Sequence, residues 1–448
     1  MPTVKQHKRS LPKILTLGFI VIIIIGSLLL MLPQATQTGL STKYSDALFT
    51  ATSATCVTGL TTLNTAAHWS IFGQVIIMIL VEIGGLGFMT FTVLLFSMLR
   101  RQPNLTTRVL VKESLNLESL ADVRTVMKYV IGLSLIIQIA GMGLLMFDFV
   151  PRFGWGKGTY FSAFHSVMSF CNAGFDLFGN SLQNFGNDPY LIFVVSLLII
   201  AGGFGFLVWR DVLLWHKNRQ VSLHTKIAIS TSAVLIVGAT VIFWFTENNF
   251  HQLKGSASGF ARLVDTFFLA VAPRTAGLNV LPYSKISMAG IVLTMVLMFI
   301  GGTTGSTAGG IKTTTVGILW LQSWAVLRGR DEVEFGRRRF TQNNVFRASM
   351  LIFVAAIIVV IAIMVLATVE TVPKQFGLEY IVFEALSAFG TAGMTMGLTP
   401  HLTVLGKAII MILMFIGRVG IFTVMFTVLN SDHPQKHYRY AEESVMIG

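Results

Sequence analysis

Long apolar runs separated by shorter polar segments recur along the whole chain. A helix of about 20 apolar residues is enough to cross the hydrocarbon core of a bilayer. Eight runs reach that length, over residues 11–32, 69–99, 125–147, 190–215, 224–246, 286–325, 345–368 and 403–430. This pattern predicts an all-α integral membrane protein with eight transmembrane helices.

The outer segments between paired runs share a second pattern, a short and moderately apolar stretch that ends in a glycine. The endings read TCVTGL, FCNAGF, PRTAGL and FGTAGM, with closing glycines at Gly59, Gly174, Gly277 and Gly393. Ten residues before each glycine lies a phenylalanine (Phe49, Phe164, Phe267 and Phe383), and five before it a small residue (Ala54, Ser169, Ala272 and Ala388). The recurrence predicts four short helices, each anchored by its phenylalanine and each followed by a glycine loop.

A glycine signature also recurs in the apolar run that follows each loop. It reads IGGLGF, AGGFGF, IGGTTG and IGRVGI, and its first glycines are Gly84, Gly202, Gly301 and Gly417. Together the two patterns predict four tandem span–pore-loop–span repeats around one central pore, that is, eight transmembrane helices plus four re-entrant pore helices. The expected repeats are residues 1–99, 122–219, 220–330 and 331–430, with a cytoplasmic linker at 100–121 and a cytoplasmic tail at 431–448.

Composition and charge agree with a membrane protein. The chain is 53% hydrophobic and 12% charged, whereas soluble proteins carry about 25% charged residues. With a cytoplasmic N-terminus, 22 Lys and Arg fall on the inner side and 9 on the outer side, as the positive-inside rule requires. We therefore expect a multi-pass protein of the plasma membrane with both termini cytoplasmic. The net charge of +13 reflects orientation and contact with membrane lipid, so no nucleic-acid partner is expected.

Four glycine loops within a membrane indicate cation permeation. Non-helical backbone cannot face lipid, so such loops are tolerated only where they line a shared water-filled axis. Glycine permits backbone dihedrals that turn successive carbonyls toward that axis, where they replace the hydration shell of an ion. The preceding short helices point their partially negative C-terminal ends at the same place, which favours cations. Asp46 and Asp265 lie near the starts of two of these helices.

These motifs, taken together, resemble the Ktr/Trk/HKT superfamily of K+ transporters, and most of all the bacterial KtrB-type membrane subunit. The resemblance implies K+ uptake through a selectivity filter, with K+ at the four loop glycines. In this superfamily glycine in all four loops accompanies K+ preference, whereas serine in the first loop accompanies Na+ transport in some plant members. The implied filter residues are Val57, Thr58, Gly59, Asn172, Ala173, Gly174, Thr275, Ala276, Gly277, Thr391, Ala392 and Gly393. A Na+-conducting relative and a secondary transporter with a midplane site remain alternatives.

The resemblance also implies partners. It predicts a homodimer on a ring of cytosolic RCK-type regulatory subunits that bind ATP or ADP. Basic segments that could contact the ring are Arg100–Lys128, Arg328–Arg339 and His433–Arg439; contact with lipid is the alternative use. K+ is the transported ion and Na+ is considered as an activator. No cofactor bound by the chain itself and no enzymatic activity are expected.

The third glycine-containing run departs from the other three. From Gly301 to Lys312 it is dominated by Gly, Thr and Ser, which are poor helix formers. We expect a loop in the inner half of the pore, similar to the intramembrane gate loop of the superfamily; a kinked helix is the alternative. The implied gate residues are Gly301, Gly302, Thr303, Thr304, Gly305, Ser306, Ala308, Gly309, Gly310, Lys312 and Arg418.

Arg418 replaces the glycine found at this position in the other three repeats, Gly85, Gly203 and Gly302. A cation in the middle of a span is costly and normally faces an interior with partners. We expect Arg418 to donate hydrogen bonds to carbonyls of the loop, or alternatively to pair with Glu82.

A few other residues invite a functional interpretation that the sequence does not favour. Cys56 and Cys171 each lie three residues before a loop glycine and are expected to contribute carbonyls, not a redox switch. His165 is expected to be a packed histidine. Arg274 is expected to point away from the ion path, because a cation facing it would repel K+.

Overall fold

The computed structural model describes residues 11–87, 123–218, 221–247, 259–330, 332–336, 338–370 and 377–429. The predicted linker at 100–121 and tail at 431–448 lie outside these residues. Within them the regular secondary structure is helical apart from one antiparallel hairpin of β1 (Glu334–Phe335) and β2 (Arg338–Arg339), and loops join the helices.

The described helices fall into four sets along the chain. The first set is α1 (Leu11–Leu30), η1 (Pro33–Ala35), α2 (Tyr44–Thr55), α3 (Thr65–His68) and α4 (Ile71–Leu86). The second set is α7 (Val123–Cys171), η2 (Gln183–Phe185), α8 (Pro189–Gly203) and α9 (Phe206–Asn218). The third set is α10 (Leu223–Thr246), α12 (Gly259–Val271), η3 (Tyr283–Lys285), α13 (Met288–Phe299) and α14 (Thr313–Leu327). The fourth set is α15 (Gln342–Val369), α16 (Leu378–Gly390), η4 (Thr399–His401), α17 (Val404–Val419) and α18 (Ile421–Leu429).

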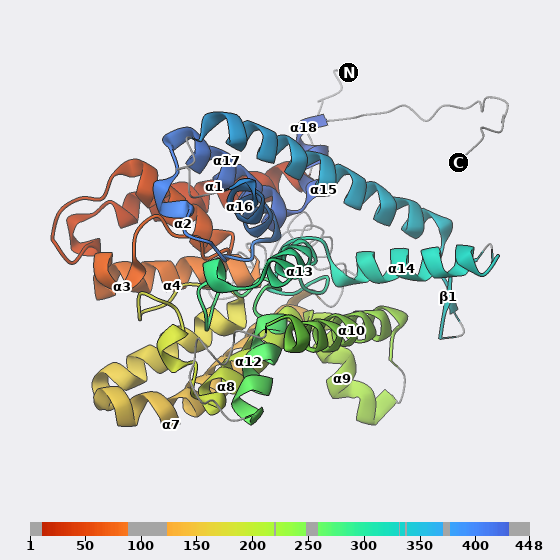
Figure 1. Ribbon diagram of the computed structural model, residues 1–448, viewed down its shortest axis with the longest axis horizontal. Coiled ribbons are helices and arrows are strands. Elements are labelled where there is room, and N and C mark those ends of the chain that lie inside the picture. The colour runs from red at the N-terminus through yellow and green to blue at the C-terminus, as the bar shows by residue number, and fades with distance from the viewer. Residues whose placement is uncertain are drawn as a thin grey trace, which may run out of the picture.

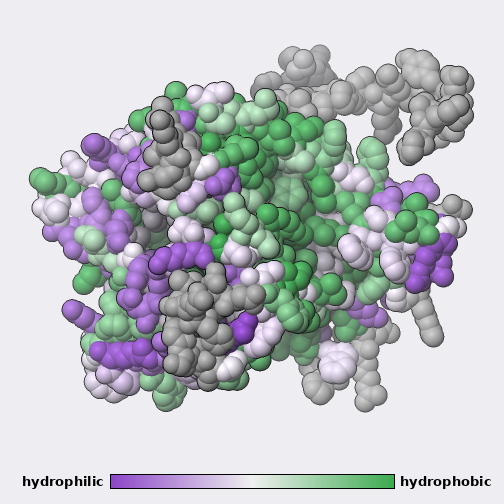
Figure 2. Space-filling model, viewed as in Figure 1, coloured by the Kyte–Doolittle hydropathy of each residue, from purple (hydrophilic) through white to green (hydrophobic). Residues whose placement is uncertain are grey.

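The first helix of each set is long and apolar enough to cross a membrane. The qualifying segments among the described residues are Lys13–Leu30, Lys128–Cys171, Leu223–Thr246 and Gln342–Val369. Large apolar side chains on these helices point outward, such as Val234 at 70% and Phe353 at 67% exposure, as expected of a surface that faces lipid. Figure 2 shows apolar side chains gathered over the middle of the molecule, with hydrophilic ones toward its two ends.

The second helix of each set ends or breaks at its glycine signature, which corrects the expectation that only the third one leaves helical geometry. α4 ends at Leu86, α8 and α9 are bent by 99° at their break, and α17 gives way to α18 at Gly420. Gly87 and Gly420, at the end of the glycine signature, have φ of 85° and 93°. Left-handed backbone cannot continue an α-helix, so these glycines end the helix.

The start of each second helix is fixed by an N-cap that sequence analysis missed. Ser70, Asp188, Ser287 and Thr403 each accept a hydrogen bond from the backbone N–H three residues further on. Each lies 14 residues before the signature glycine (84 − 70, 202 − 188, 301 − 287 and 417 − 403). In the last two sets the cap is also joined to the end of the first helix by a carboxylate. Glu247 accepts from the Ser287 hydroxyl at 2.6 Å, and Glu370 accepts from the Thr403 hydroxyl at 2.7 Å.

The short helix of each set is anchored in the core much as predicted; in the second set it is the part of α7 that follows a break at Gly154, where φ is 79°. Phe49, Phe164 and Phe383 are fully buried, whereas Phe267 is only partly buried and Phe268 is the fully buried residue of α12. The four sets close on themselves, since α1 and α2 of the first set lie beside α17 and α18 of the last (Figure 1). The short helices thereby surround the centre of the molecule.

Candidate ion-conduction site

The four loop glycines meet in a ring at this centre. A Cβ built on Gly174 would lie 3.1 Å from the Cα of Gly59 and 3.0 Å from that of Gly277. One on Gly277 would lie 3.3 Å from the Cα of Gly393, and one on Gly393 would overlap the carbonyl oxygen of Thr58. The order around the ring is therefore the order along the chain. No larger residue fits at these positions without displacing a neighbouring loop.

The backbone of all four loops follows one pattern. The residue two before each glycine is left-handed although it is not glycine, with φ of 56° at Val57, 61° at Asn172, 77° at Thr275 and 50° at Thr391. The glycines are left-handed too, with φ between 67° and 95°, and the residue between each pair is not. This alternation turns consecutive carbonyls to the same side of the chain. Left-handed backbone is costly for residues with a Cβ, at about 1–3 kcal/mol each, and it is typical of functional sites.

Each loop continues from the C-terminal end of its short helix. The N–H groups of Thr58, Ala173 and Ala392 bond back to helix carbonyls at 2.8, 2.9 and 2.7 Å, and the N–H of Gly59 donates to the Ser53 hydroxyl at 3.0 Å. These bonds occupy the N–H groups and leave loop carbonyls available. Of the twelve predicted filter residues all are buried except Gly174, which is partly exposed. Gly174 lines an outer cavity of about 210 Å³ together with Thr61, Asn64 and Asp176.

The signature glycines bring the second helices against the ends of the short helices. A Cβ on Gly84, Gly202 or Gly417 would overlap the carbonyl oxygen of Thr55, Phe170 or Phe389, respectively. Each of these carbonyls lies four residues before the loop glycine of the same set. The third set differs, because Gly301 faces the carbonyl of Gly309 in its own loop.

The segment from Gly301 to Lys312 is not helical, as predicted, and the kinked-helix alternative is wrong. It runs between α13 and α14 and is bonded to the second and fourth sets. The Thr307 hydroxyl donates to the carbonyl of Gly202 at 2.9 Å, and the N–H of Gly310 donates to that of Gly417 at 3.2 Å. Lys312 donates to the Ala308 carbonyl at 2.7 Å and so fixes the end of the loop.

Arg418 contacts this loop. Its guanidinium donates to the carbonyl of Thr307 and, on the other side, to the carbonyls of Gly84 and Gly85, the last at 2.8 Å. Glu82 instead accepts from Gln138 at 3.0 and 3.1 Å and from the Cys171 thiol at 3.2 Å. The expected hydrogen bond between Arg418 and the loop is thus present. The assignment of these residues as a gate stays a prediction.

The residues set aside by sequence analysis are packed into the structure. Arg274 is bonded to the Ser232 hydroxyl at 3.2 Å and the Gly301 carbonyl at 3.4 Å. His165 is fully buried and stacks on Phe178 at a centroid distance of 4.5 Å. Cys56 and Cys171 are free and buried. Among the described residues no group of three or more His, Cys, Asp or Glu could hold a metal ion.

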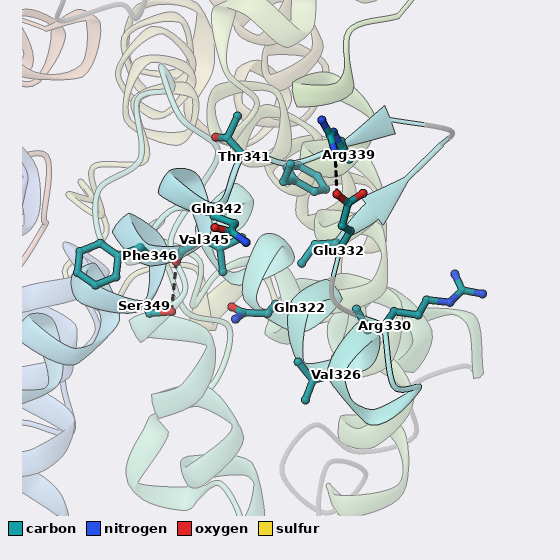
Figure 3. A pocket seen from close by; sticks show the side chains of 13 residues that line it. Gln322, Val326, Arg330, Glu332, Arg339, Thr341, Gln342, Val345, Phe346 and Ser349 are labelled. Atoms are coloured by element: carbon teal, nitrogen blue, oxygen red, sulfur yellow. Dashed lines mark hydrogen bonds and ion pairs between the residues drawn. The ribbon is translucent and has the colours of Figure 1, made fainter. Parts of the chain in front are cut away.

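A larger cavity of about 740 Å³ lies away from the loops, between α14, the hairpin and α15 (Figure 3). Its lining includes Arg330 and the Glu332–Arg339 ion pair, whose atoms are 2.6 Å apart. This cavity adjoins the predicted contact segment Arg328–Arg339 and includes none of the filter or gate residues.

Comparison with known proteins gives one consistent result. Residues 4–439 match the family described as "TrkH: Cation transport protein". The potassium/sodium uptake protein NtpJ of Enterococcus hirae is 51% identical over 447 residues, covering 99% of both chains. The Ktr system potassium uptake protein B of Bacillus subtilis is 39% identical over 99% of this chain and 98% of its own. The crystal structure of the potassium transporter TrkH from Vibrio parahaemolyticus superposes with a TM-score of 0.76 at 17% identity, over 95% of this chain and 86% of that one.

Proposed function

Because the chain belongs to the TrkH family of cation transport proteins, we propose that it is the ion-conducting membrane subunit of a potassium uptake system in the plasma membrane. The observation that carries the proposal is the ring of four glycine loops with alternating backbone dihedrals. Relatives that align over almost the whole chain are potassium uptake proteins by name, which supports K+ as the ion.

The proposed filter works by replacing water. A K+ ion entering from the outer cavity loses its hydration shell and gains carbonyl oxygens from the four loops. The loop carbonyls can do this because the N–H groups that precede them are already bonded within the short helices. The C-terminal ends of those helices add negative potential at the same point. Glycine is required in each loop because its Cβ-free backbone both tolerates positive φ and packs against its neighbours.

The segment from Gly301 to Lys312 is the proposed gate. It is bonded to α8 and α17 across the centre of the molecule, and Arg418 ties it to the first set as well. A backbone segment rich in Gly and Thr can change conformation without breaking a helix. Opening then requires the Arg418 hydrogen bond to be released, and the positive charge adds a barrier to ions while the loop is closed.

Regulation is proposed to come from cytosolic subunits. The name "Ktr system" borne by a relative fits an assembly in which a homodimer of this chain rests on an RCK-type ring that binds ATP or ADP. Arg330, which lines the cavity in Figure 3, and Arg328 are candidates for that contact. The relative named for potassium and sodium makes Na+ conduction the second candidate function, and Na+ could also act as an activator.

Growth of a bacterial host that lacks its own K+ uptake systems tests the proposal. Expression of this chain with its ring subunit should restore growth at low external K+, and Gly59→Ser should reduce K+ uptake relative to Na+ uptake. Equal initial rates for the two ions in the wild type would favour the Na+-conducting alternative. Absence of rescue by a protein that reaches the membrane would overturn the assignment.

A further inference from the structure

The filter loops need support on the side where the chain leaves them. Each loop holds two left-handed positions separated by one residue, and one of the two is not glycine. Such backbone persists only where its surroundings fix it. The entering side is fixed by the short helix. On the leaving side, three sets contain a buried polar side chain of the short helix that bonds to residues just after the loop glycine.

Glu384 of α16 shows the arrangement most fully. Its side chain is only 1% exposed, and its two oxygens accept from the hydroxyls of Thr395, at 2.9 Å, and Thr399. Thr395 comes two residues after Gly393, and its oxygen in turn accepts the N–H of Gly397 at 2.9 Å. The carboxylate therefore joins the short helix to both ends of the segment that follows the filter.

The first and second sets contain the same connection built from different groups. Asp46 of α2 accepts from the hydroxyl of Thr62 at 2.9 Å, three residues after Gly59. His165 of α7 accepts the N–H of Leu177 at 3.4 Å, three residues after Gly174. Since the other ring nitrogen of His165 donates to the Phe161 carbonyl at 2.8 Å, the histidine is held as an acceptor toward the loop.

We propose that Glu384, Asp46 and His165 are positioning residues for ion selectivity, each fixing the chain on the outer side of its filter loop. The inference rests on the proposed function and adds residues to it. The third loop is fixed instead by its neighbour, because the N–H of Asn279 donates to the Ser181 hydroxyl at 2.8 Å and its carbonyl accepts from Leu182 at 2.9 Å.

A purely structural role does not account for Glu384. Burial of a carboxylate costs free energy that an apolar residue of similar size would not. Among the described residues, its hydrogen-bond partners are the two threonines that follow the filter loop, Thr395 and Thr399. The free-energy cost of burying the Glu384 carboxylate is therefore explained by its role in positioning the segment that follows the filter loop.

The test compares K+ and Na+ flux, because a structural defect would lower both equally. Purified protein in liposomes is assayed with ⁸⁶Rb+ and ²²Na+. Glu384→Leu should lower the ratio of Rb+ to Na+ flux roughly tenfold by leaving both hydroxyls without their acceptor, and Glu384→Gln, which keeps the shape and one good acceptor, should lower it less. The double variant Thr395→Val/Thr399→Val leaves the carboxylate in place and should reproduce the loss.

A matched control is Thr368→Val, an exposed threonine whose hydroxyl bonds only within its own helix; its flux ratio should equal that of the wild type. If Glu384→Leu fails to fold, the threonine pair decides the matter. An unchanged ratio in the folded threonine variant overturns the inference. A wild type that does not favour Rb+ over Na+ overturns the proposed function instead.

Discussion

At the scale of single residues, the absence of a Cβ decides how closely two helices approach. Gly417 lies against the carbonyl of Phe389 with no room for a methyl group. That carbonyl is near the end of the short helix that leads into the fourth loop. A substitution at Gly417 therefore acts on the filter although the residue lies on another helix.

Gly417→Ala is expected to lower the thermal stability of the purified protein and to reduce K+ uptake, because the added methyl group pushes the Phe389 carbonyl out of place. Overpacking of this kind typically costs about 1–3 kcal/mol. The control is Gly143→Ala in α7, where a Cβ meets nothing within 4 Å and better helix propensity should leave stability unchanged or slightly higher. Equal melting temperatures for the two variants would contradict the prediction.

At the scale of elements, the loop between α13 and α14 is held by hydrogen bonds to the second and fourth sets as well as by bonds of its own. Its segment Thr303–Gly309 can be shortened without cutting a helix, since α13 ends at Phe299 and α14 begins at Thr313. Among the described residues, Arg418 joins this loop to the first set. In the proposed gate, the loop and the arginine hold one closed state. Shortening the loop or removing the arginine should each open that same state.

A deletion within Thr303–Gly309 should raise cation flux, because it removes backbone of the proposed gate from the inner half of the proposed pore. Arg418→Gln should raise flux in the same direction by releasing the loop, and combination of the two should add little. Flux is measured in liposomes without ring subunits, with Arg330→Gln at the surface cavity as a charge-matched control. Unchanged or abolished flux in folded deletion protein would reject the gate.

Much of this element-level picture could be predicted from sequence, and the reason differs from part to part. The loop from Gly301 was predictable because nine of the ten residues from Gly301 to Gly310 are Gly, Thr or Ser, which are poor helix formers. The bend between α8 and α9 was not, because the three glycines of AGGFGF do not by themselves end a helix in an apolar run, and Gly205 is fixed there by Thr303 of another set. The proposed positioning role of Asp46, His165 and Glu384 was not predicted, because these residues differ in chemistry and lie 13, 9 and 9 residues before their glycines.

At the scale of the whole molecule, the proposed pore is complete only when the last set meets the first. Lys407 of α17 pairs with Asp46 of α2 at 2.7 Å, with side chains only 13% and 12% exposed. The two residues are 361 positions apart. Because Asp46 also accepts from Thr62, the ion pair that closes the ring is connected directly to the segment after the first filter loop.

Lys407→Met should therefore affect both the ring and the filter. It leaves Asp46 as a largely buried carboxylate without its cation, which costs on the order of 3 kcal/mol for a well-buried pair. Asp46→Asn should also destabilise the protein, and the double variant should be more stable than the sum of the single losses predicts, since neither unpaired charge remains. Melting temperatures of the four proteins in detergent measure this coupling.

Additive losses in stability would mean that the ion pair does not hold the ring closed. If the double variant recovers stability but not K+ selectivity, the filter depends on the bond between Asp46 and Thr62 and not on the ion pair.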